Sequence, residues 1–290
     1  MQTLEGLQKK IKTVHDLLSV VKTMKSLAAV NIRQFEAAAY AVDEFSQIID
    51  MGWQIFLRHQ PALPDTSRKN STVFIVFGSD QGMCGQFNES ITDLVQTKLN
   101  SLVDQGMSVF LWTIGERVRS SLEDAHEVHY FNLPGAIQGI NEEVGNIVSH
   151  IDMWQQEKGA STIFLLHNEM VRGTSYQAVL KQLLPLDGKW LAQYRKQPWP
   201  GNCLPQQGIA GALLFRHLFR HYLFVSLYNA FAQSMASENG ARLAAMQSAE
   251  KNILETEENL QAQFRETRQS TITAELFDII AGFEALTDEQ

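Results

Sequence analysis

One loop of this chain combines glycines with a cysteine, the residue types that phosphate binding or nucleophilic chemistry would need. Gly78, Gly82 and Gly85 follow a short apolar run, and Cys84 stands among them. Such a loop between a strand and a helix can direct backbone N–H groups at a phosphate. The spacing, however, matches neither G-x-x-x-x-G-K-[ST] nor G-x-G-x-x-G. We interpret the loop as a tight strand-to-helix turn with Cys84 as a small packed residue. A nucleophilic Cys84 is the alternative, although nothing local supplies a histidine base.

Two histidine pairs resemble parts of metal sites. His217 and His221 are four residues apart on an expected helix, and His126 and His129 flank an expected strand. The H-E-x-x-H glutamate is missing, and neither pair has an evident third ligand. The acidic residues near 255–258 are most simply a solvated helix face. The sequence therefore predicts no catalytic residues, no metal site and no cofactor.

The composition of the 290-residue chain is that of a folded protein of one or two domains, with 44% hydrophobic and 19% charged residues. A net charge of −8 argues against bulk nucleic-acid binding. No apolar run is long enough to span a membrane, and the N-terminus lacks the apolar core of a secretory signal. The only cysteines, Cys84 and Cys203, suggest a reducing compartment without disulfides.

The first 58 residues predict one very long helix with a seam of heptad spacing. No proline occurs before Pro61, and the apolar residues alternate steps of three and four. A seam of this period favours a left-handed coil. Lys25 interrupts it, and we expect this lysine to mark where the seam meets something other than its helical mate. The seam residues are Leu4, Leu7, Ile11, Val14, Leu18, Val21, Lys25, Ala28, Ile32, Phe35, Ala39 and Val42.

Residues 208–290 predict a second long helix, since no proline follows Pro205. Its seam begins near Tyr228 and slips near Gly240. Two such helices at opposite ends of a chain must bury their stripes against each other or against a partner. The final turns are apolar on several sides, which predicts a sleeve of protein around them. The alternative is a frayed amphipathic end. This apolar tip comprises Leu276, Phe277, Ile279, Ile280 and Phe283.

Residues 59–207 predict a small α/β layer structure with a largely parallel sheet, because short apolar runs alternate with helical patterns. We expect helices near 87–103, 115–124 and 138–156. We expect strands near 72–77, 108–114, 128–133, 161–167 and, at an edge, 179–186.

Four stretches resemble the gamma subunit of F-type ATP synthases. Residues 11–29 resemble I-x-S/T-V…K-A/T-M-x-x-V/L-A-A, and residues 79–88 resemble S-x-D-R/K-G-L-C-G-x-x-N. Residues 236–246 resemble A-S-E-x-A-A-R-M-x-A-M, and residues 265–276 resemble N-x-x-R-Q-x-x-I-T-x-E-L. Together they cover essentially the whole chain, and four motifs in the right order are highly specific.

This sequence departs from the family pattern in several places. Gln81 stands where the family usually carries Arg or Lys, and Gly240 replaces an expected alanine. Residues 30–35 contain one basic residue where the family is usually richer in them. These departures point to a divergent branch, such as a second-locus F-type ATPase.

The resemblance implies an α+β fold in three parts. An N-terminal shaft helix (1–58) and a C-terminal shaft helix (208–290) would form a long antiparallel left-handed coiled coil. A small Rossmann-like α/β domain (59–207) would lie between them in the sequence. The chain would be the central rotor stalk, transmitting torque between the membrane c ring and the catalytic beta subunits.

The resemblance further implies partners and location. The partners would be the alpha and beta subunits, the epsilon subunit and the c ring, with no nucleic acid and no directly bound nucleotide. The chain would be non-catalytic and lie on the cytoplasmic face of a bacterial plasma membrane, held through the c ring only. The competing reading from another class is a coiled-coil scaffold with an α/β binding domain. The coupling ion, H⁺ or Na⁺, is set by other subunits.

The resemblance also assigns surfaces. Contacts with beta subunits would involve Met24, Lys25, Arg242, Arg268, Gln269 and Thr273. The apolar tip would turn in an apolar collar. A foot on the c ring would involve Tyr194, Arg195 and Lys196. Two alternatives stay open: Arg242 as a seam residue within the shaft, and the foot as a solvent loop whose tryptophans pack on the domain.

Overall fold

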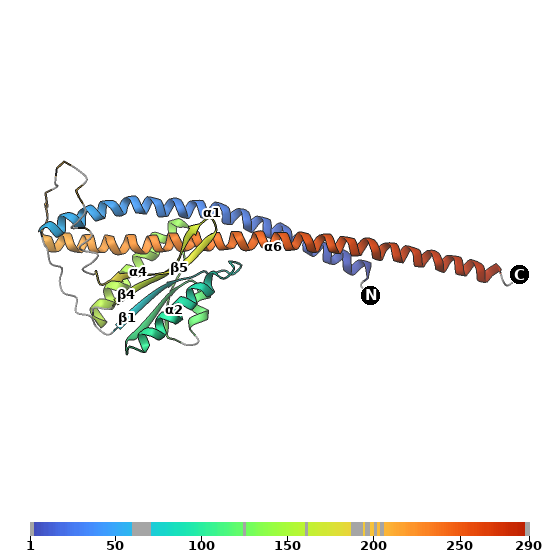
Figure 1. The fold of residues 1–290 in the computed structure, drawn as a ribbon, viewed down its shortest axis with the longest axis horizontal. Helices are drawn as coiled ribbons and strands as arrows, with labels where there is room; N and C mark the ends of the chain where they lie inside the picture. The colour runs from blue at the N-terminus through green and yellow to red at the C-terminus, as the bar shows by residue number, and fades with distance from the viewer. Residues whose placement is uncertain are drawn as a thin grey trace. The chain divides into compact units, whose positions relative to one another are not determined.

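The computed structural model describes residues 3–59, 71–123, 126–159, 162–186, 194, 198–199, 202–203 and 206–287. The chain divides into two compact units: Met1–Leu27 with Ala245–Gln290, and Ala28–Ala244. Helix α1 (Leu4–His59) and helix α6 (Gly211–Thr287) each contribute residues to both units (Figure 1). The two long helices predicted from the sequence are therefore confirmed. The division into three domains stays a prediction.

The heptad seam of α1 is confirmed by burial. Every predicted seam residue from Leu4 to Val42 is buried or half-buried, whereas most of the residues between them are exposed. Leu7, Leu18 and Ala28 are among the fully buried ones. A stripe of this period stays on one side of the helix only when it faces a second helix along its length.

The seam of α6 changes character along the helix. Residues 227–241 are almost continuously buried, whereas from Met246 to Thr271 a narrow stripe at steps of three and four is covered. A helix that is covered on most sides lies inside a packed domain, and one with a narrow stripe meets a single partner. From Ile272 to Ala281 every residue is exposed.

The unit of residues 28–244 contains a five-stranded sheet of order β3-β2-β1-β4-β5. All neighbouring strands are parallel except β4 and β5, which are antiparallel. This order, with β1 inside, is that of a doubly wound α/β sheet with an antiparallel edge strand. The strands are β1 (Ser71–Phe77), β2 (Ser108–Ile114), β3 (Val128–Phe131), β4 (Thr162–Arg172) and β5 (Ser175–Leu184). The shorter helices are α2 (Phe87–Val103), α3 (Glu116–Leu122) and α4 (Ile137–Lys158).

The predicted end of β4 at His167 is wrong, because the strand continues to Arg172. Its pairing with β1 ends at Leu166, and beyond that point β4 pairs only with β5 as a two-stranded hairpin. A hairpin outside the sheet core accepts polar residues, so the apolar run that signalled the strand stops before the strand does. β5 also begins earlier than predicted, at Ser175.

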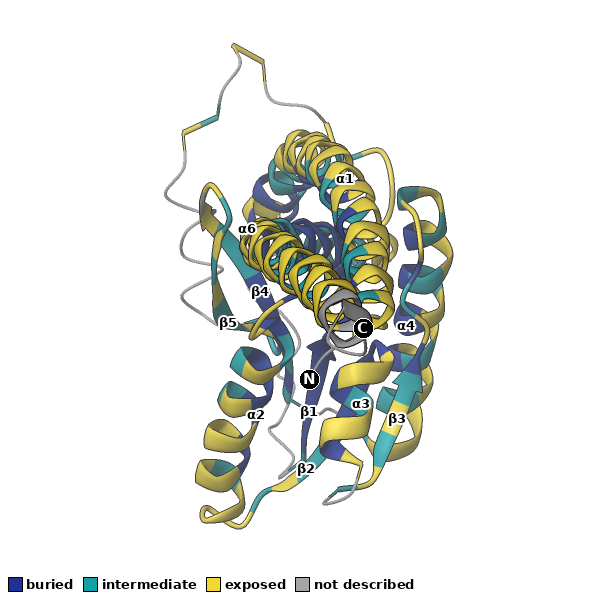
Figure 2. Cartoon of the chain, turned by 90° about the vertical axis from the view of Figure 1, so that its right-hand side faces the viewer, coloured by how far each residue is buried: buried dark blue, intermediate teal, exposed yellow. Residues whose placement is uncertain are grey.

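Two hydrophobic layers cover the sheet (Figure 2). One face packs against α2 and α3, through residues such as Phe74, Ile91 and Val118. The other face packs against α4 and against the parts of α1 and α6 in this unit, through residues such as Phe77 and Phe231, whose rings meet edge to face at 4.9 Å. The predicted fold class, α+β with helical ends and a central mixed sheet, is confirmed. No helix in the described residues has the length and apolarity that crossing a membrane requires.

Candidate functional site

In the unit of residues 1–27 with 245–290, α1 and α6 run antiparallel. His15 Nδ1 lies 4.0 Å from Glu257 Oε1, and Lys25 is ion-paired with Glu250. The later residue of α1, Lys25, is paired with the earlier residue of α6, Glu250, as an antiparallel arrangement requires. The seam between them holds Leu7, Leu18 and Met246 in buried positions. The two helices thus form a paired rod within this unit.

Lys25, the charged residue in the apolar seam, forms an ion pair with a residue of the same chain. Its ammonium group donates to the Glu250 carboxylate, and the two side chains are 34% and 18% exposed. Met24, the preceding predicted contact residue, is half-buried on the same helix. The predicted contacts of Met24 and Lys25 with beta subunits stay predictions. The lysine that would make such a contact is already paired with a carboxylate.

Three of the predicted beta-contact residues, Arg268, Gln269 and Thr273, are exposed on α6. The Thr273 hydroxyl donates to the Gln269 carbonyl one turn earlier, at 2.8 Å. Among the described interactions, no ion pair holds the Arg268 guanidinium. Its planar set of donors is therefore free to form paired bonds with a carboxylate of another chain.

The apolar tip of α6 is exposed in this chain. Within its own unit α6 continues past the beginning of α1, so its last turns have no helical mate among the residues that the structure describes in this unit (Figure 1). Four large apolar side chains there are between 44% and 70% exposed: Leu276, Phe277, Ile279 and Ile280. The fifth predicted tip residue, Phe283, has a side chain outside the described residues. An exposed apolar surface of this kind, with no partner in the described part of the chain, is typical of a protein contact.

Arg242 pairs with Glu238 one turn earlier on α6. Its Nη2 lies 2.5 Å from Glu238 Oε1, and the two side chains are 15% and 8% exposed. Burial raises the pKa of the Glu238 carboxyl, and the neighbouring guanidinium partly offsets that rise. This pairing favours the interpretation of Arg242 as a residue of the chain's own packing, while its contact with a beta subunit stays a prediction.

Of the three predicted foot residues, only Tyr194 lies within the described residues. Its ring is buried in a cluster with Trp53, Phe56 and Leu218, and its hydroxyl donates to Asp50 Oδ1 at 2.7 Å. Burial raises the pKa values of both Tyr194 and Asp50. Tyr194 itself is therefore held against α1. Arg195 and Lys196 lie outside the described residues.

A family model described as ATP synthase matches residues 3–286 of this chain. The ATP synthase gamma chain of Sorangium cellulosum is 31% identical over 231 residues, covering 77% of this chain and 71% of that protein. The chain belongs to the ATP synthase gamma chain family. The gamma chain of Geotalea uraniireducens is 25% identical over 298 residues, covering 99% of each chain. The members of this family are subunits of an enzyme complex.

Solved structures share the fold of this gamma-family chain. A chain of the OSCP/F1/c-ring assembly of Euglena gracilis mitochondrial ATP synthase matches with a TM-score of 0.66 and 16% identity, covering 98% of this chain and 94% of that one. A chain of the central stalk and c ring of the Tetrahymena thermophila mitochondrial ATP synthase matches with a TM-score of 0.56 and 21% identity, covering 79% and 99%.

The glycine loop of this gamma-family chain lies where a doubly wound sheet would bind a ligand. Such sheets bind ligands beyond the carboxyl ends of the strands at the point where strand order reverses, here between β1 and β4. In this chain α6 occupies that place. Ser237, which is fully buried on α6, donates to the Asn168 carbonyl of β4 at 3.1 Å, and Asn168 Nδ2 donates to the Phe87 carbonyl at 3.0 Å. The crevice is thus filled by the chain itself.

The loop's own side chains are bonded to one another. Asn88 Nδ2 donates to Ser79 Oγ at 2.8 Å, and Asn88 Oδ1 accepts from the Ser79 backbone at 3.1 Å. Gly78 must be small, because a Cβ there would lie 2.2 Å from Val118 Cγ2. The loop is therefore a packed turn, as predicted.

Cys84 is 1% exposed and packs against Phe87 and Ala241. Burial raises the pKa of its thiol. A nucleophilic cysteine needs the thiolate and therefore a lowered pKa, so this environment argues against the enzyme alternative. In the described part of the chain, no group of three or more His, Cys, Asp or Glu residues that could hold a metal ion comes together.

Several paired groups give little or no signal in the amino-acid sequence. Glu250 and Glu238 look like ordinary solvated glutamates in the sequence, although each pairs with a cation. The one available signal was the seam position of Lys25, which calls for a carboxylate on the facing helix. Asn31, whose Nδ2 donates to Asn239 Oδ1 at 3.3 Å, gives no signal at all.

Proposed function

We propose that this chain is the central rotor stalk of an F-type ATP synthase or ATPase, transmitting torque between a membrane c ring and catalytic beta subunits. Membership of the gamma chain family supports this function. The observation that carries it is the end of α6, where large apolar side chains are exposed to solvent in the described structure. A rod of paired helices ending in an apolar tip suits rotation inside a collar, because apolar contacts contain no directional bonds that a turn must break.

The chain would carry no active site and no cofactor of its own. The filled crevice between β1 and β4 supports the absence of a nucleotide site, since Ser237 of α6 stands where a nucleotide would bind. The buried Cys84 supports the same conclusion. ATP chemistry would belong to the beta subunits, and nucleic acid would not be a partner.

The partners would be the alpha and beta subunits, the epsilon subunit and the c ring. Exposed Arg268 and Gln269, with Thr273, would meet a loop of a beta subunit. Met24, Lys25 and Arg242 would also contact beta subunits. The segment of Tyr194, Arg195 and Lys196 would form the foot on the c ring. The complex would lie on the cytoplasmic face of a bacterial plasma membrane, either as the main enzyme or as a second-locus form.

Rotation can be tested through a native thiol. Cys203 is exposed and Cys84 is buried, so a maleimide-biotin should label Cys203 selectively. A bead attached there, on a complex whose alpha and beta subunits are fixed to glass, should turn in one direction when ATP is added. A Cys203→Ser complex provides the unlabelled control. A bead that only diffuses while the complex hydrolyses ATP would show that the chain is a scaffold and not a rotor.

The beta contact has its own test. Arg268→Ala combined with Gln269→Ala should reduce assembly yield or coupled ATPase activity of the complex, because both side chains are exposed and available for a partner. Gln263→Ala, at an exposed position on the same helix, is the matched control. Normal yield and rate in the double variant would remove Arg268 and Gln269 from the interface.

A further inference from the structure

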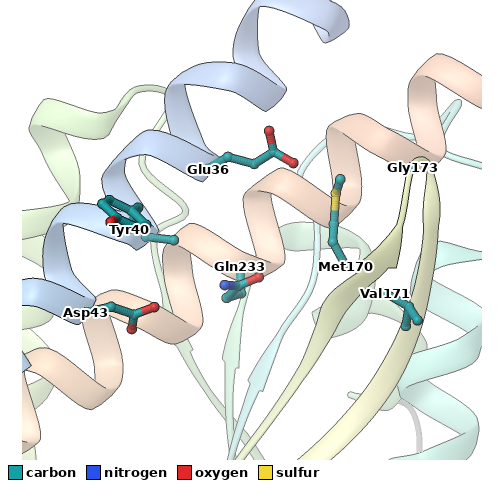
Figure 3. Close-up of a pocket in the computed structure, with 8 residues that line it drawn as sticks. Glu36, Tyr40, Asp43, Met170, Val171, Gly173 and Gln233 are labelled. Carbon is teal, nitrogen blue, oxygen red and sulfur yellow. The ribbon is translucent and has the colours of Figure 1, made fainter.

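A hollow of about 320 Å³ lies between α1, α6 and the β4–β5 hairpin in the unit of residues 28–244 (Figure 3). Its two carboxylates, Glu36 and Asp43, stand about two helical turns apart on α1, and the Tyr40 ring points away from the hairpin. These groups do not converge on one point, so the hollow gives no specific ligand site. Two histidines of the same unit are arranged differently, because their rings are in direct contact.

These two histidines, His129 of β3 and His150 of α4, form what we call the histidine stack. Their ring centroids are 4.3 Å apart, and the angle between the ring planes is 11°. Among the described residues, neither imidazole makes a hydrogen bond or an ion pair. His129 is exposed and His150 is half-buried. The stack is therefore held by ring contact alone, at a place where solvent protons have access to it.

Strand alternation turns the two faces of β3 toward different helices. The Arg119 guanidinium of α3 lies over the Tyr130 ring, 5.2 Å from its centroid. His129 and Phe131 lie on the opposite face of the strand. Both of their rings contact His150 of α4, with centroid distances of 4.3 and 5.5 Å. β3 is a four-residue strand at the edge of the sheet and is paired only with β2. So short an edge strand depends on side-chain contacts of this kind as well as on its ladder.

The histidine stack borders a buried tryptophan. Trp112 of β2 is the cross-strand neighbour of His129, and its ring lies 4.7 Å from that of His150. Trp112 is 1% exposed. Trp154, one turn after His150 on α4, meets the same tryptophan edge to face at 5.6 Å. Loss of the stack would therefore bring solvent closer to an aromatic cluster that joins β2, β3 and α4.

The geometry of the stack suits protons and not a metal ion. An imidazole binds a metal through a lone pair in its ring plane, at about 2 Å. Two nearly parallel rings with centroids 4.3 Å apart cannot both direct such a lone pair at one ion. A neutral ring can stack on a neutral or on a charged one, whereas two charged rings repel each other. Histidine is the side chain that changes its charge near neutral pH.

The surroundings of His150 oppose its protonation. Burial lowers the pKa of His150 below its ordinary value of 6.5, and a charged His129 lowers it further, whereas Glu157 of α4 raises it. The third element in contact, β2, contributes the uncharged Trp112. The unfolded chain therefore takes up this proton at a higher pH than the folded chain. The stabilisation is complete above about pH 6.5 and declines as the pH falls below that value.

We propose that the histidine stack is a pH-sensitive latch, which holds β3 against α4 at neutral pH and releases the strand in acid. Once both rings are charged, repulsion replaces the attractive contact between His129 and His150. A short edge strand that has lost such a contact opens locally while the rest of the domain stays folded. The proposal does not rest on the rotor function, because every group that it uses belongs to β2, β3 or α4.

Hydrogen–deuterium exchange of the full-length chain tests the latch. Exchange is followed at about pH 7.5 and about pH 5.5, on either side of the ordinary histidine pKa, and corrected for the intrinsic effect of pH on amide exchange. The protection of residues 128–131 should fall about tenfold at the lower pH, while that of the central strand β1 should not change.

Four variants identify the groups responsible. His129→Phe and His150→Phe each keep a ring in the stack but leave only one ring that can be charged, so the fall in protection should disappear. His129→Gln, at an exposed position, is a second variant that removes the ring. Its protection should be low at both pH values and independent of pH. His126→Gln is the matched control and should behave like the wild type, because His126 precedes β3 and makes no ring contact among the described residues.

Three results would overturn the proposal. The first is a protection of residues 128–131 in the wild type that does not depend on pH. The second is a fall in protection that persists in His129→Phe, His150→Phe and His129→Gln, because another group would then be titrating. The third is a fall of equal size in β1, which would indicate that acid unfolds the whole domain. None of these results bears on rotation of the complex, so the two proposals fail independently.

Discussion

Lys25 of α1 and Glu250 of α6 form an ion pair across the seam of the paired helices. Both belong to the unit of residues 1–27 with 245–290, and both side chains keep some contact with solvent. A polar pair within an otherwise apolar seam favours one register of the two helices over its neighbours, since a shift by a heptad would separate the charges. The pair therefore contributes more to register than to stability.

A single and a double variant can measure this balance. Lys25→Met should lower the free energy of unfolding by about 1 kcal/mol, because it leaves the Glu250 carboxylate in the seam without its cation. The double change of Lys25→Met and Glu250→Leu should recover that loss, because two apolar residues then continue the seam. Urea unfolding of the full-length chain gives both values. A double variant less stable than the single one would contradict this account.

The period of the seam could be predicted from the sequence, but the identity of the partners could not. Apolar residues at steps of three and four define which side of α1 is covered, and this is a local property of one helix. Which α6 residue stands opposite Lys25 depends on the register of two distant segments, and several registers satisfy the same apolar pattern. Glu250 therefore became visible only in the structure.

The same distinction applies to the sheet and the foot. Buried strands such as β1 are visible as apolar runs, whereas the hairpin extension of β4 past His167 mixes polar and apolar residues and gives no continuous apolar run. Tyr194 resembled a surface residue beside two basic neighbours. In the structure it packs in a cluster with Trp53 and donates a hydrogen bond to Asp50, which is 144 positions away in the sequence.

Replacing Cys84 tests whether this residue of the glycine loop has a packing role or a chemical role. Cys84→Ala should lower the free energy of unfolding by about 1 kcal/mol, because it removes a buried sulfur packed against Phe87 and Ala241. The ATPase rate of the assembled complex should not change. Cys203→Ala, at an exposed cysteine, should change neither quantity. Loss of ATPase activity in a stably assembled Cys84→Ala complex would revive a chemical role for this thiol.

The lowered pKa of Glu169 should make the free energy of unfolding depend on pH in the acidic range. The hydrogen bond from His167, with help from Lys181, lowers the pKa of this carboxyl from 4.5 to about 2. The unfolded chain therefore takes up this proton near pH 4.5 and the folded chain only near pH 2. The stabilisation is complete above about pH 4.5 and is lost as the pH falls toward 2.

Glu169→Gln removes this titration. The variant should be less stable than the wild type at pH 7, and the difference should shrink as the pH falls from about 4.5 toward 2. Glu44→Gln, at an exposed position, should show no such convergence. Denaturant unfolding at several pH values between 7 and 3 gives the comparison. A constant difference across that range would mean that Glu169 gains nothing from His167 and Lys181.

Variants of the α6 tip can distinguish between two interpretations, a rotor bearing and a frayed helix end. Removing residues 284–290 should leave assembly and ATPase activity of the complex close to normal, because the apolar set ends near Phe283. Removing residues 276–290 should lower assembly yield or coupling, because it deletes Leu276, Phe277, Ile279 and Ile280, whose exposed apolar surface needs a collar. Replacing these four residues by serine in the full-length chain should reproduce the effect without shortening the helix. If the serine variant assembles and couples normally, the tip is only a frayed end, whatever the truncations do.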